Sequence, residues 1–130
     1  MIARGRLARW TLVLAGFLFL VVGILMLMDP RLLQGLGFRL ESPIAVSEVR
    51  ATYGGMHVFV GLLLLVGAFA VRIRDAALLI LATYTVGVVV GRVVGFVVDG
   101  WPGPLVALFL APEALAAVLA TLLLIVRRSP

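Results

Sequence analysis

Three ionisable side chains suited to binding or proton transfer, His57, Arg92 and Glu113, lie inside strongly apolar stretches of this 130-residue chain. Arginine offers N–H donors and a permanent charge, glutamate offers two acceptor oxygens, and histidine exchanges a proton near neutral pH. A charge in apolar surroundings is costly and normally has a partner. These residues therefore predict a guanidinium–carboxylate pair, Arg92–Glu113, with the imidazole of His57 beside it.

The same side chains do not match a catalytic or metal-binding pattern. One histidine and one carboxylate are too few ligands for a metal site, and an arginine beside them repels cations. No nucleophile–base pair or cofactor motif is visible, and the lack of cysteine excludes disulfides and thiol redox chemistry. We expect a protein that is not an enzyme and that uses no cofactor and no metal.

The elements that position these residues are predicted to be membrane-spanning helices. Hydrophobic residues make up 64% of the chain, against about 45–50% in ordinary soluble domains. Four stretches reach the length of about 20 apolar residues that crosses a bilayer, and LLLLV and GVVVG lack the alternation of barrel strands. We expect one all-α domain over residues 1–130, an integral membrane four-helix bundle with up-down-up-down antiparallel topology. The predicted helices cover residues 10–28, 43–71, 76–98 and 105–126.

Two local patterns mark helix starts within this layout. Asp29-Pro30 and Ser42-Pro43 each combine a capping residue with proline at the first helical position. The first predicts a short interfacial turn after the first span, and the second predicts the start of the second span.

The arginines predict the orientation, because cytoplasmic loops are enriched in basic residues. The formal charge of +5 comes from short arginine clusters at the ends of apolar runs, not from one basic face. We therefore expect no nucleic-acid partner, and an integral membrane protein with both termini in the cytoplasm. The arginines predicted inside are Arg4, Arg6, Arg9, Arg72, Arg74, Arg127 and Arg128, and those predicted outside are Arg31, Arg39 and Arg50.

Counting along the predicted helices places the three ionisable residues at one depth, about 8–11 Å below the outer membrane boundary. Arg50 and Tyr53 precede His57 on the same helical face. The hypothesis is an outward-facing polar site for a small anionic or amphiphilic molecule, with a buried ion pair that only fixes helix register as the alternative. The predicted site residues are Arg50, Tyr53, His57, Arg92 and Glu113.

Small residues predict where the helices pack. Glycines at four-residue spacing on the third helix form a groove that admits another helix, and glycines on the second helix share the face of His57. We expect these two faces to pack on each other, with homodimerisation through the third helix as the alternative. The positions are Gly87, Gly91 and Gly95 on the third helix, and Gly54 and Gly61 on the second.

Three motifs carry a family resemblance: VRATYGGMH (49–57), GRVVGFVVDGWP (91–102) and APEAL (111–115). At these motifs the chain resembles a bacterial four-helix membrane family known as domain of unknown function 4345, and in layout it is distantly similar to DoxX-like proteins. The resemblance implies a four-helix membrane fold in the bacterial inner membrane and no defined substrate. It marks Arg50, Tyr53, Gly54, Gly55, His57, Arg92, Asp99 and Glu113 as family positions.

Besides the lipid bilayer, three kinds of partner remain open: a small amphiphilic ligand, a larger membrane protein and a second copy of the chain. An accessory protein would bind its membrane partner through the glycine groove. A small proton-coupled transporter would rely on a lone membrane carboxylate, whereas Glu113 has a predicted arginine partner. We therefore favour ligand binding over these alternatives.

Overall fold

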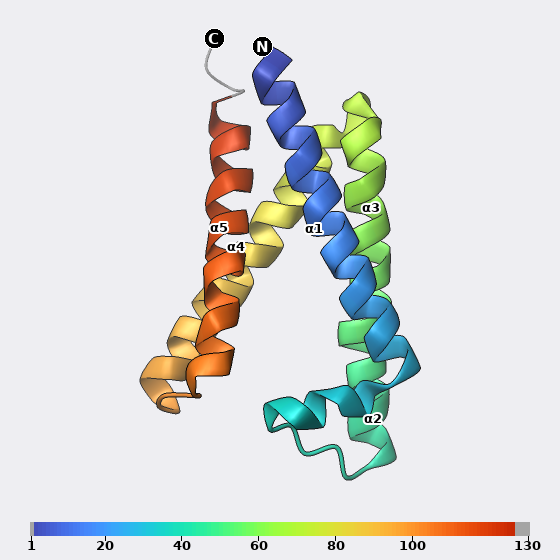
Figure 1. Cartoon of the computed structure of the whole chain (residues 1–130), viewed down its shortest axis with the longest axis vertical. Helices are drawn as coiled ribbons and strands as arrows, with labels where there is room; N and C mark the ends of the chain where they lie inside the picture. The colour runs from blue at the N-terminus through green and yellow to red at the C-terminus, as the bar shows by residue number, and fades with distance from the viewer. Residues whose placement is uncertain (1, 127–130) are drawn as a thin grey trace.

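The computed structural model describes residues 2–126, and this part of the chain is helical without any strand. Three short segments, α2, η2 and α3, follow one another directly and form one long helix (Figure 1). The elements are α1 (Ile2–Met28), the 3-10 helix η1 (Pro30–Leu36), α2 (Pro43–Val49), the π-helix η2 (Arg50–Met56), α3 (His57–Phe69), the 3-10 helix η3 (Val71–Ile73), α4 (Arg74–Val98) and α5 (Pro104–Ile125).

Four helical segments are long and apolar enough to cross a membrane: Arg4–Met28, Pro43–Phe69, Val71–Val98 and Pro104–Ile125. The all-α class and the four apolar helices predicted from the sequence are thus confirmed for the described residues. The first helix begins at Ile2 rather than at residue 10, so the first cluster of arginines continues the helix instead of preceding it. The predicted cytoplasmic residues Arg127 and Arg128 lie outside the described part.

Both predicted helix starts are present. Asp29 accepts a hydrogen bond at 3.0 Å from the backbone N–H of Arg31, which caps η1. Ser42 accepts one at 3.1 Å from the N–H of Ala45, which caps α2. Each cap satisfies a helix N–H that has no partner within the helix.

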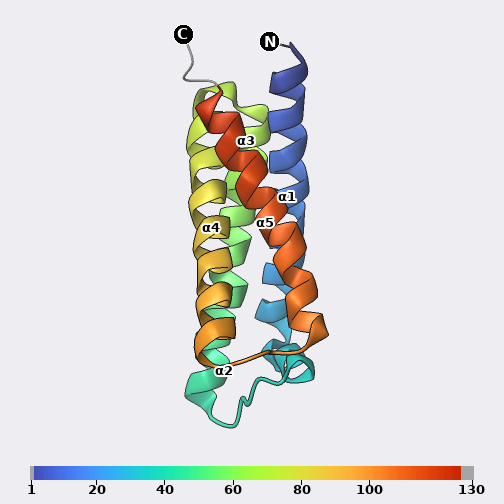
Figure 2. The same cartoon turned by 90° about the vertical axis from the view of Figure 1, so that its left-hand side faces the viewer.

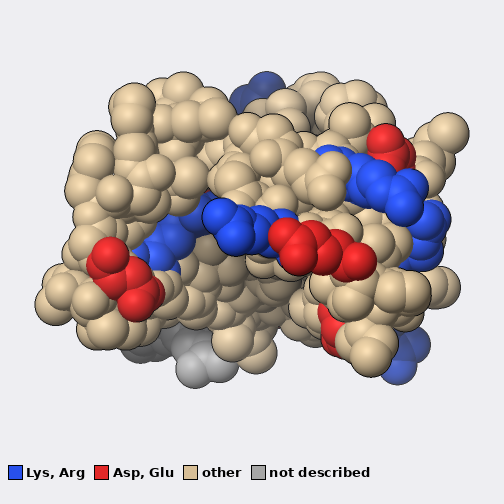
Figure 3. Space-filling model, turned by 90° about the horizontal axis from the view of Figure 1, so that it is seen from below, with Lys and Arg blue, Asp and Glu red and all other residues tan. Residues whose placement is uncertain are grey.

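The long helices pack in two pairs, α1 with α3 and α4 with α5 (Figures 1 and 2). The beginning of α1 and the end of α5 lie at the same end of the molecule, where all four helices meet in one apolar core. Towards the opposite end the two pairs diverge, and a view from below shows that end hollowed between them (Figure 3). The core residues are Ala8, Leu12, Leu64, Ala68, Ala77, Leu78, Leu81, Ala82, Ala120 and Leu123.

The glycines of η2 and α3 do form a close helix contact, but the partner is α1 and not α4. A Cβ atom added at Gly61 would lie 2.8 Å from the carbonyl oxygen of Gly16, and one added at Gly54 would lie 2.9 Å from Leu27. On α1, a Cβ at Gly23 would lie 2.7 Å from the backbone nitrogen of Val58. Small residues on both helices thus allow their backbones to touch.

The predicted packing of the α4 glycines against the second span is wrong. Cβ atoms added at Gly87 and Gly91 would meet nothing within 4 Å, and one at Gly95 would meet only the carboxylate of Asp99 on its own helix, at 3.8 Å. The reason is that the glycines of α1 already occupy the small-residue face of the second span. Side chains at these three α4 positions would therefore make no close contact with another helix in the described part of the chain.

Arginine side chains donate to the last carbonyls of three of the long helices, groups that have no partner within the helix. In each case the arginine comes from another element, so the bond also ties two segments together. The bonds are Arg50 Nη1 to the Leu27 oxygen of α1, Arg74 Nη2 to the Ala68 oxygen of α3 at 2.9 Å, Arg74 Nε to the Gly67 oxygen at 3.4 Å, and Arg4 Nη2 to the Leu123 oxygen of α5 at 2.5 Å.

Candidate functional site

The centre of the candidate site is the ion pair between Arg92 on α4 and Glu113 on α5. Arg92 donates through Nε to Oε2 at 2.5 Å and through Nη2 to Oε1 at 2.7 Å. The two planar groups therefore meet in the bidentate arrangement in which such pairs bind most strongly. The predicted pair is present, and the tight turn between α4 and α5 explains it, because antiparallel neighbours bring these two positions together.

The Arg92–Glu113 pair is partly exposed, and its two charges cancel. The side chains of Arg92 and Glu113 are 26% and 25% exposed. Arginine carries five N–H groups, and among the described residues Arg92 uses only the two that bond Glu113. The pair is thus neutral as a whole, holds both oxygens of Glu113 in place, and still offers free donors on Nη1 and Nη2.

His57 has a defined tautomer, set by the π-helix that precedes it. Its Nδ1 lies 3.1 Å from the carbonyl oxygen of Thr52, and its Nε2 lies 3.0 Å from the hydroxyl of Tyr84. A carbonyl oxygen can only accept, so Nδ1 carries the proton and donates. In the neutral imidazole Nε2 then accepts, and the hydroxyl of Tyr84 is its donor.

Aromatic rings surround this imidazole. The ring of His57 stacks on Phe19 at a centroid distance of 5.1 Å and on Tyr53 at 5.8 Å, while Tyr84 meets it edge-on at 5.6 Å. Phe38, just after η1, packs edge-on against Tyr53 at 6.3 Å. The result is a flat-sided aromatic cluster built from α1, η2, α3 and α4.

The predicted direct contact between His57 and the ion pair is wrong. The polar partners of His57 are Thr52 and Tyr84. Because α3 packs mainly on α1, and α4 diverges from both, the imidazole bonds Tyr84 of α4 and forms no hydrogen bond with Arg92 or Glu113 in the described part of the chain.

Tyr84 and Phe19 are site residues that the sequence reasoning missed. Tyr84 precedes Arg92 by about two helical turns and is one of only two tyrosines in the chain. That spacing on one apolar helix was a usable signal. Phe19 carried no comparable signal, because α1 contains several large apolar residues of the same kind.

The remaining predicted residues divide between two places. Tyr53 belongs to the aromatic cluster around His57. Arg50 does not join either group: its guanidinium donates to the carbonyl of Leu27 at the end of α1, and its side chain lines a separate cavity near η1. Within the described residues, no three His, Asp or Glu side chains come together in a way that could hold a metal ion.

Comparison with known proteins places this geometry in a family. The family with the description "Domain of unknown function (DUF4345)" matches residues 7–124, a range that includes every residue of the candidate site. No curated protein and no solved structure matches the chain. Since the match covers most of its length, the chain belongs to the DUF4345 family.

Proposed function

We propose that this protein is a multi-pass protein of the bacterial inner membrane that binds a small amphiphilic molecule between its two helix pairs. In this proposal the four apolar helices span the bilayer as an up-down-up-down antiparallel bundle with both termini in the cytoplasm. The lengths of the helices and the arginines at the end that carries both termini support this arrangement. The protein acts by binding and not as an enzyme.

The observation that carries the binding proposal is the partly exposed Arg92–Glu113 pair, which lies in the halves of α4 and α5 nearer the turn between them. An ionisable group inside a membrane segment is by default a candidate functional group. Because Glu113 neutralises Arg92, the free guanidinium donors suit a neutral or singly charged head group that accepts hydrogen bonds. The aromatic cluster around His57 supplies an apolar wall for the rest of the molecule.

The binding proposal can be tested by ligand-dependent melting of the purified protein in detergent. Single-chain amphiphiles with different head groups, such as lysophosphatidylcholine and monoolein, are added to the wild type and to Arg92→Ala and Glu113→Ala. We expect at least one probe to raise the melting temperature of the wild type and to have a smaller effect on both variants. Arg39→Ala, which removes an exposed arginine outside the site, is the control. Folded site variants with the wild-type response would reject the proposal.

The topology can be tested separately, because the chain contains no cysteine. Gly5→Cys and Gly35→Cys place a thiol where an added side chain meets nothing within 4 Å. With a membrane-impermeant maleimide on intact cells, the thiol at position 35 should react, and the thiol at position 5 should react only after permeabilisation. The reverse pattern would contradict the proposed orientation.

A second candidate function is favoured by the open glycine face of α4. Cβ atoms added at Gly87, Gly91 and Gly95 would lie within 4 Å of no other helix that the structure describes, and small-residue faces in membranes pack against helices. In this alternative the protein is an accessory subunit of a larger membrane protein, or it dimerises. A photo-crosslinking residue at Gly91 in native membranes separates the outcomes, since it would capture a different protein, a second copy or lipid alone.

A further inference from the structure

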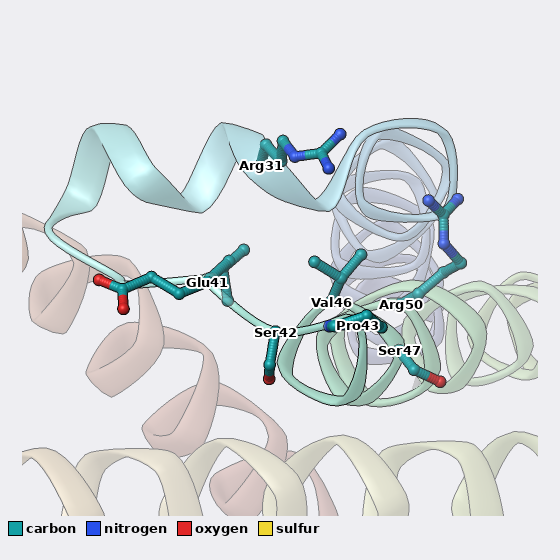
Figure 4. A pocket seen from close by; sticks show the side chains of 8 residues that line it. Arg31, Glu41, Ser42, Pro43, Val46, Ser47 and Arg50 are labelled. Atoms are coloured by element: carbon teal, nitrogen blue, oxygen red, sulfur yellow. The ribbon is translucent and has the colours of Figure 1, made fainter.

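A cavity lies between η1 and the start of α2 (Figure 4), at the end of the molecule away from the termini (Figure 1). Its volume is about 460 Å³, within the range of small-molecule sites. Its walls are fixed by the capped starts of η1 and α2 and by an apolar cluster beneath them. The cluster is formed by Met26, Leu33, Leu40 and Val49.

Both arginines that line this cavity keep N–H groups that bond no described residue. Arg31 and Arg50 line it together with one acidic residue, Glu41. The guanidinium of Arg31 bonds no described residue, and Arg50 uses Nη1 on the carbonyl of Leu27. Figure 4 shows the carboxylate of Glu41 pointing away from both guanidinium groups. The arginine side of the cavity is therefore positively charged.

The surroundings of the cavity are amphipathic. Leu40, Pro43 and Val46 provide its apolar lining, and Ile44 beside it is 75% exposed. The 3-10 helix η1 runs across the end of the helix pairs (Figure 1). In the membrane orientation proposed above, this places the arginines among the lipid head groups and the exposed apolar side chains at the acyl-chain boundary.

We propose that this cavity binds the phosphodiester head group of an anionic phospholipid from the outer leaflet. Guanidinium groups bind phosphate through paired, charge-assisted hydrogen bonds, and a lining with two arginines and one carboxylate favours an anionic lipid over a zwitterionic one. The apolar lining accepts the glycerol and the first carbons of the chains. The inference rests on the proposed membrane insertion, and it does not depend on the site at Arg92 and Glu113.

The test is native mass spectrometry of the full-length protein in detergent with three probes: dioleoyl phosphatidylglycerol, dioleoyl phosphatidylcholine and glycerol phosphate. The wild type should retain one phosphatidylglycerol more tightly than phosphatidylcholine, and glycerol phosphate should not compete at equal concentration. Arg31→Gln should weaken retention about fivefold, as expected for one basic residue at an anionic membrane surface. Arg31 is exposed, so this variant should fold, and Arg31→Lys should recover part of the retention.

Arg39→Gln is the matched control, since it removes the same charge from the same segment outside the cavity. If Arg31→Gln and Arg39→Gln weaken lipid retention equally, the lipid is attracted by net charge alone, and the proposal that it binds in this cavity is rejected. If glycerol phosphate competes as strongly as phosphatidylglycerol, the occupant is the phosphate group alone and not a lipid. If phosphatidylglycerol and phosphatidylcholine are retained equally, the proposed preference for an anionic lipid is rejected. If Glu113→Ala abolishes lipid retention and Arg31→Gln does not, the lipid belongs to the intramembrane site and this inference fails.

Discussion

A single methyl group added at Gly61 tests how α1 and α3 hold together. The Cβ atom of alanine at this position would lie 2.8 Å from the carbonyl oxygen of Gly16 and 2.9 Å from the backbone nitrogen of Leu20. Both neighbours are backbone atoms of α1, so no flexible side chain can move aside. Gly61→Ala therefore requires α1 to shift away from α3 along their whole contact.

The expected cost follows from this geometry. Overpacking of this kind typically costs about 1–3 kcal/mol, while alanine regains up to about 1 kcal/mol of helix propensity over glycine. Gly91→Ala on α4 carries the same gain in propensity, but its Cβ would meet nothing within 4 Å. The difference between the two variants isolates the helix contact, and we expect Gly61→Ala to be less stable than Gly91→Ala by about 2 kcal/mol.

The measurement is the free energy of unfolding in mixed micelles as the fraction of sodium dodecyl sulfate is raised, followed by the fluorescence of Trp10 and Trp101. Gly23→Ala should be destabilised in the same way, because its Cβ would lie 2.7 Å from the backbone nitrogen of Val58. A neutral Gly61→Ala would show that α1 and α3 do not pack as described. A destabilised Gly91→Ala would instead show that the α4 face is covered in solution, by a second copy or by another helix.

Three further changes test the site and the helix ends. Glu113→Gln leaves the guanidinium of Arg92 without its counter-charge and should lower the free energy of unfolding by about 2 kcal/mol. This is less than for a fully buried pair, because about a quarter of each side chain is exposed. Unchanged stability would mean that the ion pair contributes nothing to folding. Tyr84→Phe removes the donor to Nε2 of His57 and should lower the free energy of unfolding by about 1 kcal/mol. It should also shift the imidazole ¹⁵N resonances in micelles, and unchanged resonances would contradict the hydrogen bond. Arg74→Lys keeps the positive charge but loses the paired hydrogen bonds to the end of α3. The variant should keep the wild-type orientation in thiol labelling, and its free energy of unfolding should fall by about 1 kcal/mol. Wild-type stability would show that only the charge matters at this position.

The four apolar helices and the Arg92–Glu113 pair could be predicted from the sequence because each depends on local information. Span length follows from composition over about 20 residues. A short turn makes α4 and α5 antiparallel neighbours, so residues at comparable distances from that turn can meet: Arg92 lies six residues before the end of α4, and Glu113 lies nine residues after the start of α5. The pair needed no knowledge of how the two halves of the protein are arranged.

The choice of packing partner could not be predicted from the glycines of α4 alone. Gly91 and its neighbours carry the familiar four-residue spacing, whereas the contact that forms uses glycines seven apart on both helices, Gly16 and Gly23 on α1 and Gly54 and Gly61 on the second span. Equal spacing on two antiparallel helices was the informative signal. A motif on one helix states that close approach is possible, and a matching motif on another helix shows where it occurs.

The π-helix explains why Arg50 does not lie over His57. An α-helical count places the two residues on one face, but the wider turn of η2, which contains the Gly54-Gly55 pair, changes the phase between them. Arg50 therefore reaches the carbonyl of Leu27, while the imidazole of His57 reaches back to the carbonyl of Thr52. A π-helix depends on tertiary packing, so residue spacing alone did not reveal it.

The basic residues of this chain are all arginine. The hydrogen bonds at the helix ends explain this preference over lysine, which the charge bias of membrane topology does not. A charge bias alone is satisfied equally by lysine. Arg4, Arg50 and Arg74 each donate to carbonyl oxygens at the end of a helix from another part of the chain, and Arg74 bonds two of them at once. A planar guanidinium does this with little loss of side-chain freedom, whereas an ammonium group is a compact and strongly hydrated charge. The same role explains why Arg50 is on the proposed outer side, where the charge bias works against it: at that position the arginine satisfies the end of α1, and its remaining donors face the cavity beside η1.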